Sequence, residues 1–258
     1  MVGFSQDLNP EELRPARYFG RDFVIWRSAA GELRVFDAHC PHLGAHLGHG
    51  GKVEGDSIRC PFHAWGFDGT GKCSDIPYAS RIPPKARVGA HPTLERNGTL
   101  MMWFDPAGGP AEEYVPHVQE FGGDDWTPWM HRTAVIKTHP REVVENVADV
   151  AHFPLVHGNE VLSFEAAFEG PTATQSTRTT GYDKKGRLTK QHTVATYYGP
   201  AIQFSHMDGE FPTVILNAHT PIDENELELR MGLLIKGIDY ESKTGRLLGD
   251  MWIDALQE

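Results

Sequence analysis

Two mixed cysteine–histidine pairs, set in a glycine-rich segment, constrain this chain of 258 residues more than any other feature. The segment reads CPHLGAHLGHGGKVEGDSIRCPFH. In it, Cys40 and His42 form a C-x-H pair, and Cys60 and His63 form a C-x-x-H pair. Each pair offers one thiolate and one imidazole from its own loop. The four donors predict a metal centre held between two loops.

This donor set is typical of a Rieske 2Fe–2S cluster, in which two thiolates bind one iron and two neutral imidazoles bind the other. A structural zinc site also accepts two cysteines and two histidines, but it usually keeps like ligands together. The mixed pairs therefore favour the iron–sulfur cluster. The third cysteine, Cys73, is interpreted as a packed thiol. Tight turns are expected at the glycines of the segment, which are Gly44, Gly48, Gly50 and Gly51.

A second histidine pair, His152 and His157, lies in the segment ENVADVAHFPLVHG. Pro140 and the apolar side that follows it predict a helix through residue 151. Five residues of regular helix turn by about 500°, which leaves two side chains about 140° apart around the axis. Pro154 predicts a break that lets both imidazoles converge on one metal. Taken alone, such a pair is more often two packed histidines than a metal site.

Composition restricts the classes of partner. Hydrophobic residues make up 40% of the chain and charged residues 23%, as in soluble globular proteins. The net charge of -11 provides no broad basic surface for nucleic acid or an anionic membrane. The sequence has no apolar run near the roughly 20 residues of a membrane span, and its start lacks the layout of a secretory signal. We therefore expect a cytoplasmic protein with reduced thiols.

The pattern of the chain predicts two domains of the α+β class. Residues 1–105 contain short strand-like runs broken by glycine and proline, which indicates an all-β domain. Residues 106–130 are rich in proline, glycine and acidic residues, so we expect a connection over the surface. Residues 131–258 contain long alternating runs between helical segments, which predicts an antiparallel sheet with helices.

With these motifs, the whole chain resembles the oxygenase component of Rieske non-haem iron oxygenases. The resemblance implies a Rieske domain followed by a catalytic domain of the helix-grip type, with a 2Fe–2S cluster on Cys40, His42, Cys60 and His63. Rieske subunits of cytochrome bc complexes carry two further cysteines, where this chain has Ala45 and Phe62. That branch is therefore disfavoured.

The family also has a mononuclear Fe(II) site with the pattern N-x-x-D-x-x-H and a second histidine, which NVADVAHFPLVH matches. The resemblance implies that His152 and His157 bind this iron. It gives Asp149 the role of a bridge between the iron site and a cluster ligand of the next subunit, and it places Asn146 near the iron. From the residues alone, Asp149 also reads as a solvated side chain and Asn146 as an ordinary helix amide.

The third iron ligand of the family is a carboxylate on a C-terminal helix. Three candidates lie in the closing segment, namely Asp250, Asp254 and Glu258. Because the chain stops in mid-helix without a cap, we expect a fragment whose third ligand is one of these residues or lies past residue 258.

The segment from residue 71 to residue 108 is most similar to the sterol-acting branch, which contains 3-ketosteroid 9α-hydroxylases and cholesterol 7-desaturases. The resemblance implies hydroxylation or desaturation of an apolar ring substrate, such as a steroid or sterol, by O2. It also implies electrons from an NADH-dependent ferredoxin reductase or a ferredoxin, and a homotrimer. The alternatives are an aromatic-ring-hydroxylating dioxygenase and a Rieske electron-transfer protein without oxygenase activity.

Overall fold

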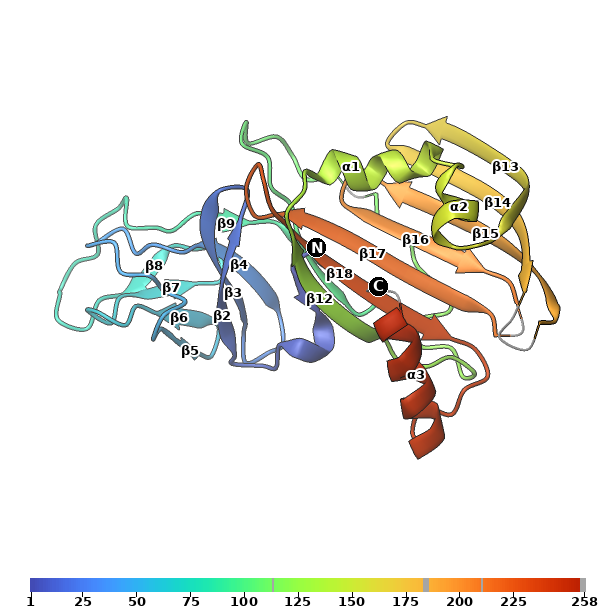
Figure 1. Ribbon diagram of the computed structural model, residues 1–258. Helices are drawn as coiled ribbons and strands as arrows, with labels where there is room; N and C mark the ends of the chain where they lie inside the picture. The colour runs from blue at the N-terminus through green and yellow to red at the C-terminus, as the bar shows by residue number, and fades with distance from the viewer. Residues whose placement is uncertain (113, 183–185, 210, 256–258) are drawn as a thin grey trace. The chain divides into compact units, whose positions relative to one another are not determined.

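The computed structural model describes residues 1–112, 114–182, 186–209 and 211–255, and the chain forms two compact units (Figure 1). One unit contains Met1–Glu113 and Ile222–Glu224, and the other contains Tyr114–Pro221 and Asn225–Glu258. The division falls inside the segment 106–130 that was expected to connect the domains. No helix among the described residues is long and apolar enough to cross a membrane.

The first unit is built from short antiparallel strands in three sheets, as expected from its turn-rich sequence. The three-stranded sheet has the order β1 (Gly3–Phe4), β11 (Thr99–Met102), β10 (Thr93–Arg96). One four-stranded sheet has the order β2 (Leu13–Tyr18), β3 (Arg21–Arg27), β4 (Leu33–Asp37), β9 (Ala90–His91). The other has the order β5 (Lys52–Glu54), β6 (Ser57–Arg59), β7 (Gly66–Asp68), β8 (Cys73–Asp75). A short 3-10 helix, η1, spans Ser5–Asp7.

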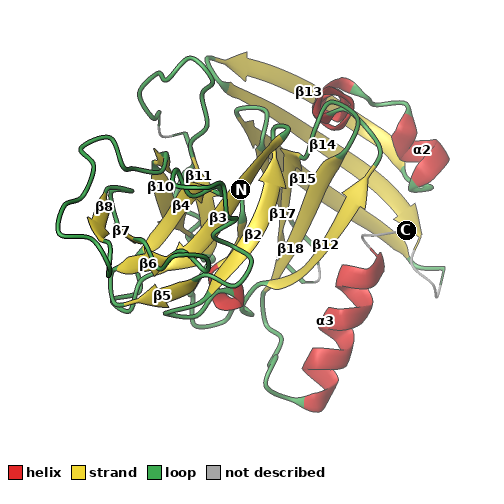
Figure 2. Cartoon of the chain, turned by 90° about the vertical axis from the view of Figure 1, so that its left-hand side faces the viewer, coloured by secondary structure: helices red, strands yellow, loops and turns green. Residues whose placement is uncertain are grey.

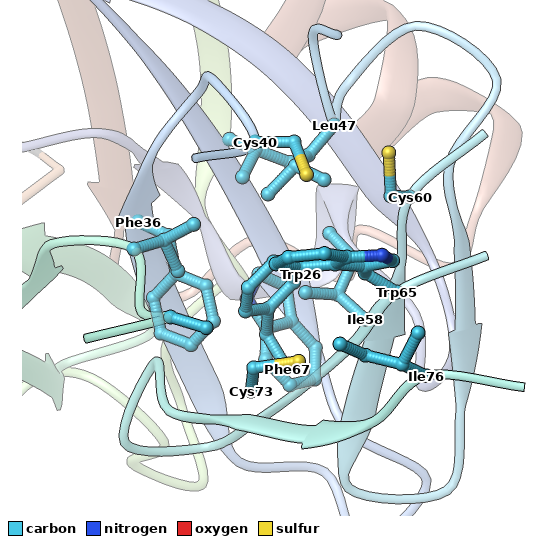
Figure 3. Close-up of a cluster of buried hydrophobic side chains, with 13 residues drawn as sticks. Trp26, Phe36, Cys40, Leu47, Ile58, Cys60, Trp65, Phe67, Cys73 and Ile76 are labelled. Atoms are coloured by element: carbon cyan, nitrogen blue, oxygen red, sulfur yellow. The ribbon is translucent and has the colours of Figure 1, made fainter. Parts of the chain in front are cut away.

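Strand β3 is buried on both faces along its centre, which explains the apolar run from Phe23 to Trp26. Successive side chains of a strand point to opposite faces. Val24 and Trp26 pack into one core cluster with the β6–β8 region, whereas Phe23 and Ile25 pack into a second cluster with Leu100 of β11. Figure 3 shows the first of these clusters, and both predicted cluster cysteines belong to it.

The second unit is organised around a seven-stranded antiparallel sheet, and Figure 2 shows its strands in yellow and its helices in red. Its strand order is β12 (Met130–Ile136), β18 (Leu227–Ile235), β17 (Thr213–Pro221), β16 (Ile202–Met207), β15 (Leu188–Tyr198), β14 (Thr172–Tyr182), β13 (Glu160–Glu169). The helices are α1 (Pro140–Glu145), η2 (Asn146–Ala148), α2 (His152–Val156) and α3 (Lys243–Ala255). The expected class, an all-β domain followed by an antiparallel sheet with helices, is confirmed.

Two local expectations were wrong. The helix that begins at Pro140 ends at Glu145 and continues only as the 3-10 turn η2, and Asp149 is then extended with φ -85° and ψ 99°. Pro154 does not break a helix, because α2 begins at His152 and the proline lies in its first turn, where it removes no intrahelical hydrogen bond. The break lies before the histidines rather than between them.

The segment expected to run over the surface between the domains is also partly buried. Val118 and Trp129 belong to the buried side chains of the molecule. Thr127 donates its backbone N–H to the Ile235 carbonyl, and its Oγ1 accepts the Ile235 N–H at 3.0 Å. This part of the segment is therefore fastened to β18.

Candidate metal centres

The two loops that carry the predicted cluster ligands fold in the same way. The N–H of Cys40 donates to the Ala45 carbonyl, and the N–H of Cys60 donates to the Trp65 carbonyl, each at 2.9 Å. In each loop, the residue four positions after the cysteine donates back to the cysteine carbonyl, and this residue has a positive φ: 74° at Gly44 and 57° at Ala64. The glycine at residue 44 suits this conformation, whereas Ala64 adopts it against its preference.

These matched turns bring the predicted ligands together as two pairs. The imidazole rings of His42 and His63 have centroids 4.6 Å apart. Cys40 and Cys60 are 2% and 4% exposed, and Figure 3 shows their sulfur atoms on one side of the buried tryptophans, with Cys73 on the other. Burial raises the pKa of Cys40 to about 11. The hydrogen bond from the His42 backbone N–H lowers this pKa, whereas the neighbouring Cys60 thiol raises it further.

The chemistry of this donor set fits a Rieske cluster. The Nδ1 atom of His42 is buried and has no hydrogen-bond partner, as expected of a nitrogen that binds a metal. The thiols are free, and each would become a thiolate on binding iron. Among the described residues, no three His, Cys, Asp or Glu side chains are grouped closely enough to hold a metal as they stand. The two pairs therefore provide the donors but not a closed cage.

Three exposed apolar side chains lie next to the histidine pair, either in sequence or in space. Leu43 is 64% exposed, and Phe62 and Tyr78 are each 62% exposed. The Phe62 ring centroid lies 3.9 Å from that of His63, and the Tyr78 ring centroid lies 6.5 Å from it. The histidine side of this centre thus opens onto an apolar surface. We call Leu43, Phe62 and Tyr78 the cluster rim.

The second histidine pair lies at the two ends of α2, where His152 is the first helical residue and His157 is the C-cap. The ring centroids of His152 and His157 are 5.2 Å apart with an interplanar angle of 75°. Desolvation lowers the pKa of His157, and the neighbouring His152 lowers it further, which favours the neutral form that binds metals. The buried Nδ1 atom of His152 makes no hydrogen bond of normal geometry, and its nearest charged neighbour is Asp149 Oδ2 at 3.5 Å. The pair therefore supplies two donors of the kind that Fe(II) accepts.

Asp149 holds the start of α2 and faces His152. Its Oδ1 accepts the N–H of Ala151 at 3.0 Å and the N–H of His152 at 3.3 Å. Its Oδ2 lies 3.5 Å from Nδ1 of His152, which leaves Nε2 of that ring for a metal. Asn146, at the start of η2, lines an open hollow of about 880 Å³ together with Asp149 and Phe168. The structure thus brings Asp149 to the histidine pair and places Asn146 along the same segment.

The candidate third ligands are not brought to this pair. Asp250 and Asp254 lie on α3, where Arg132 of β12 donates to Asp254 Oδ1 at 3.0 Å and to Asp250 Oδ1 at 3.4 Å. Helix α2 contacts β13, and α3 contacts β12, which are the two edges of the seven-stranded sheet. Six strand spacings of about 4.8 Å separate these edges along the sheet. Asp250 and Asp254 therefore pair with Arg132 at the β12 edge of the sheet. Glu258 lies outside the described residues.

Two residues that contact a predicted ligand or the helix before the iron motif were missed in the sequence. Trp65 stacks on His42, with ring centroids 4.6 Å apart and an interplanar angle of 5°, and its Nε1 donates to the Tyr78 hydroxyl at 2.7 Å. Tyr197 of β15 donates its hydroxyl to the Val143 carbonyl of α1 at 3.1 Å. Trp65 lies two residues after His63, and this closeness to a predicted ligand could have singled it out. No pattern in the sequence connects Tyr197 with α1.

Models of two protein families match this chain. The Rieske [2Fe-2S] domain matches residues 1–88, and the 3-ketosteroid 9alpha-hydroxylase C-terminal domain matches residues 102–255. Curated relatives are 3-ketosteroid-9-alpha-monooxygenase oxygenase components. The protein from Rhodococcus rhodochrous is 39% identical over 95% of this chain and 67% of its own length. The protein from Mycobacterium tuberculosis is 30% identical over 93% of this chain and 66% of its own length.

A cholesterol 7-desaturase from Xenopus laevis is 38% identical over 60% of this chain and 35% of its own length. The chain thus spans about two thirds of the length of the first set of relatives. Among solved structures, dicamba monooxygenase bound to dicamba aligns with a TM-score of 0.76 at 17% identity, over 91% of this chain and 76% of the other. This last likeness concerns the fold alone.

Proposed function

Because this chain belongs to the Rieske oxygenases, as an oxygenase component of the 3-ketosteroid 9α-monooxygenase branch, we propose that it hydroxylates or desaturates a steroid or sterol with O2. The observation that carries the proposal is the pair of converging imidazoles, His152 and His157, in the second unit. A Rieske electron carrier needs only the first unit. The second unit and its histidine pair have no use in such a carrier.

Cys40 and Cys60 would bind one iron of a 2Fe–2S cluster, and His42 and His63 would bind the other. Support comes from the buried cysteine pair, from the adjacent imidazoles and from the Nδ1 of His42, which has no hydrogen-bond partner. His152 and His157 would bind a mononuclear Fe(II). When bound, the two centres supply electron transfer and the reductive activation of O2.

The remaining residues of the second site orient the iron ligands. Asp149 fixes the backbone at Ala151 and His152, and its second oxygen faces Nδ1 of His152, so that Nε2 is directed elsewhere. Asn146 lines the same open hollow as Asp149, three residues before it in the chain. The third iron ligand would be a carboxylate outside the described residues, for which Glu258 is the candidate in this sequence.

We propose a homotrimer in which electrons pass between subunits, and a separate NADH-dependent ferredoxin reductase or ferredoxin as electron donor. Both centres have exposed apolar surroundings that suit docking. The cluster rim is one such surface, and on α2 Leu155 and Val156 are 85% and 72% exposed beside the histidine pair. Such exposed apolar side chains are typical of surfaces that other proteins cover.

The experiment that tests the function counts iron and sulfide in the purified protein and then measures coupled oxygen uptake. The proposed enzyme binds about three irons and about two sulfides per chain, whereas a Rieske electron carrier binds about two of each. With a reductase present, a 3-ketosteroid should stimulate O2 uptake and yield an oxidised product. Stimulation by an aromatic acid but not by steroids or sterols would favour the aromatic-ring dioxygenase, and two irons with no uptake would favour the carrier.

A further inference from the structure

Helix α1 ends immediately before the predicted iron motif. A hydrogen bond from the seven-stranded sheet holds its last turn. The helix spans Pro140–Glu145, and the next residue, Asn146, starts the 3-10 turn η2. The last four carbonyl groups of an α-helix have no partner within the helix. Val143 lies in this last turn, so its carbonyl needs a donor from outside.

That donor is Tyr197 of β15. Its hydroxyl donates to the Val143 carbonyl at 3.1 Å, and its side chain is 2% exposed. Burial raises the pKa of Tyr197 to about 12, so the hydroxyl retains its proton at any ordinary pH. The hydroxyl can therefore act as a donor to the Val143 carbonyl throughout the ordinary pH range.

The position of Tyr197 is itself fixed by the sheet. Its backbone pairs with Ala173 on β14 and with Gln203 on β16, so β15 is held on both sides. The ring of the fully buried His219 flanks the tyrosine ring, with centroids 6.4 Å apart. Tyr197 is thus a rigid point to which α1 is attached.

We propose that Tyr197 is a positioning residue for the mononuclear iron site, acting through α1 on Asn146 and Asp149. The path is short and continuous: the tyrosine hydroxyl fixes Val143, three residues later η2 begins, and Asp149 then holds the N–H of His152. This role rests on the function proposed above. It concerns a residue that lies 40 positions after the last residue of the iron motif in the sequence.

Tyr198 provides a matched control. Successive side chains of a strand point to opposite faces, so Tyr198 lies on the other face of β15. Its ring lies 6.1 Å from that of Phe204, and burial raises its pKa as well. Tyr197→Phe removes the hydroxyl of a buried tyrosine, and Tyr198→Phe removes the hydroxyl of its half-buried neighbour. Only the first change deprives the Val143 carbonyl of α1 of its donor.

The test compares the wild-type holoprotein with these two variants. The measurements are the affinity for Fe(II) in competition with a chelator, hydrogen exchange over residues 143–149, and steady-state kinetics. Tyr197→Phe should weaken iron binding by between about twofold and about tenfold, the equilibrium equivalent of one hydrogen bond. It should also speed exchange in this segment and lower kcat, with KM for substrate unchanged. Tyr198→Phe should match the wild type.

Equal iron affinity and equal exchange in the wild type and Tyr197→Phe would overturn the positioning role alone. Equal losses in Tyr197→Phe and Tyr198→Phe would also overturn it, because a general loss of sheet stability would then explain both. A wild-type protein that binds no third iron would instead overturn the proposed function. The absorption spectrum of the 2Fe–2S cluster, whose predicted ligands lie in the other unit, should be the same in every variant, which shows that the first unit is folded and loaded with its cluster.

Discussion

The imidazole of His42 lies flat against the indole of Trp65, with ring planes inclined by 5°. The indole cannot turn freely, because its Nε1 donates to the Tyr78 hydroxyl and its side chain is 8% exposed. Groups that hold a ligand from behind fix its orientation before a metal binds. The plane of one predicted cluster ligand is therefore set by the protein rather than by the metal.

This stacking leads to a prediction about redox potential. An oxidised cluster with two thiolates and two neutral imidazoles is uncharged, and the reduced cluster is an anion, which water stabilises. Trp65→Leu should admit water beside His42 and raise the midpoint potential. Tyr78→Phe, which retains the indole beside His42 and removes only its hydrogen-bond acceptor, should change the potential less. A redox titration followed by EPR measures both, and a fall in potential for Trp65→Leu would contradict the argument.

A second prediction separates the two metal centres. His152→Ala should lose about one iron per chain and all oxygenation, because two remaining protein donors are too few to retain Fe(II). Asp149→Ala should retain both metals but lose turnover, since its carboxylate contacts His152 without being a predicted ligand. Iron and sulfide analysis, together with single-turnover oxidation of the reduced cluster, distinguishes the two. Normal turnover in His152→Ala would contradict the mononuclear-iron assignment.

The sequence predicted candidate donor residues, but it did not predict the path of the chain around them. The cysteine–histidine pairs were recognisable because ligand type and spacing are local properties of two loops, and the strand-rich first unit followed from its turns. The path of the chain near Pro154 was misjudged, since a proline in a first turn begins a helix as readily as a proline in the middle breaks one. Tyr197 could not be found, because its hydrogen bond to Val143 joins elements 54 residues apart.

The acidic residues of α3 show the same limit. Their sequence pattern suited a helix with one charged face, but only the strand order reveals that this helix contacts β12, at the opposite edge of the sheet from the strand that contacts α2. Ile253 is fully buried with Met130 and Leu233, which fixes the face that α3 presents to the sheet. Asp250 and Asp254 then face Arg132.

A third prediction follows from this arrangement. Asp250→Asn and Asp254→Asn should leave the iron content unchanged, because both carboxylates pair with Arg132. Since the arginine and both carboxylates are partly exposed, each loss should lower the free energy of unfolding by less than about 1 kcal/mol. Metal analysis and denaturant titration of each variant provide the test. Loss of one iron from either variant would restore that residue as the third ligand.

The last prediction concerns His219, a fully buried residue of β17 whose ring nitrogens have no hydrogen-bond partner of normal geometry. Burial lowers its pKa to about 4, against a smaller opposing effect of the Pro200 carbonyl. In the unfolded chain a histidine has a pKa of about 6.5, so between these two values the unfolded state binds a proton that the folded state does not. The free energy of unfolding should therefore fall as the pH decreases from about 6.5 to about 4, and His219 should contribute on the order of 3 kcal/mol to this fall.

His219→Gln removes the titrating group but keeps a polar side chain. The difference between the pH dependence of its unfolding free energy and that of the wild type isolates the contribution of His219 from that of the other histidines. Denaturant titrations of both proteins at several pH values measure this difference, and two parallel curves across that range would show that the imidazole is not kept neutral by the fold.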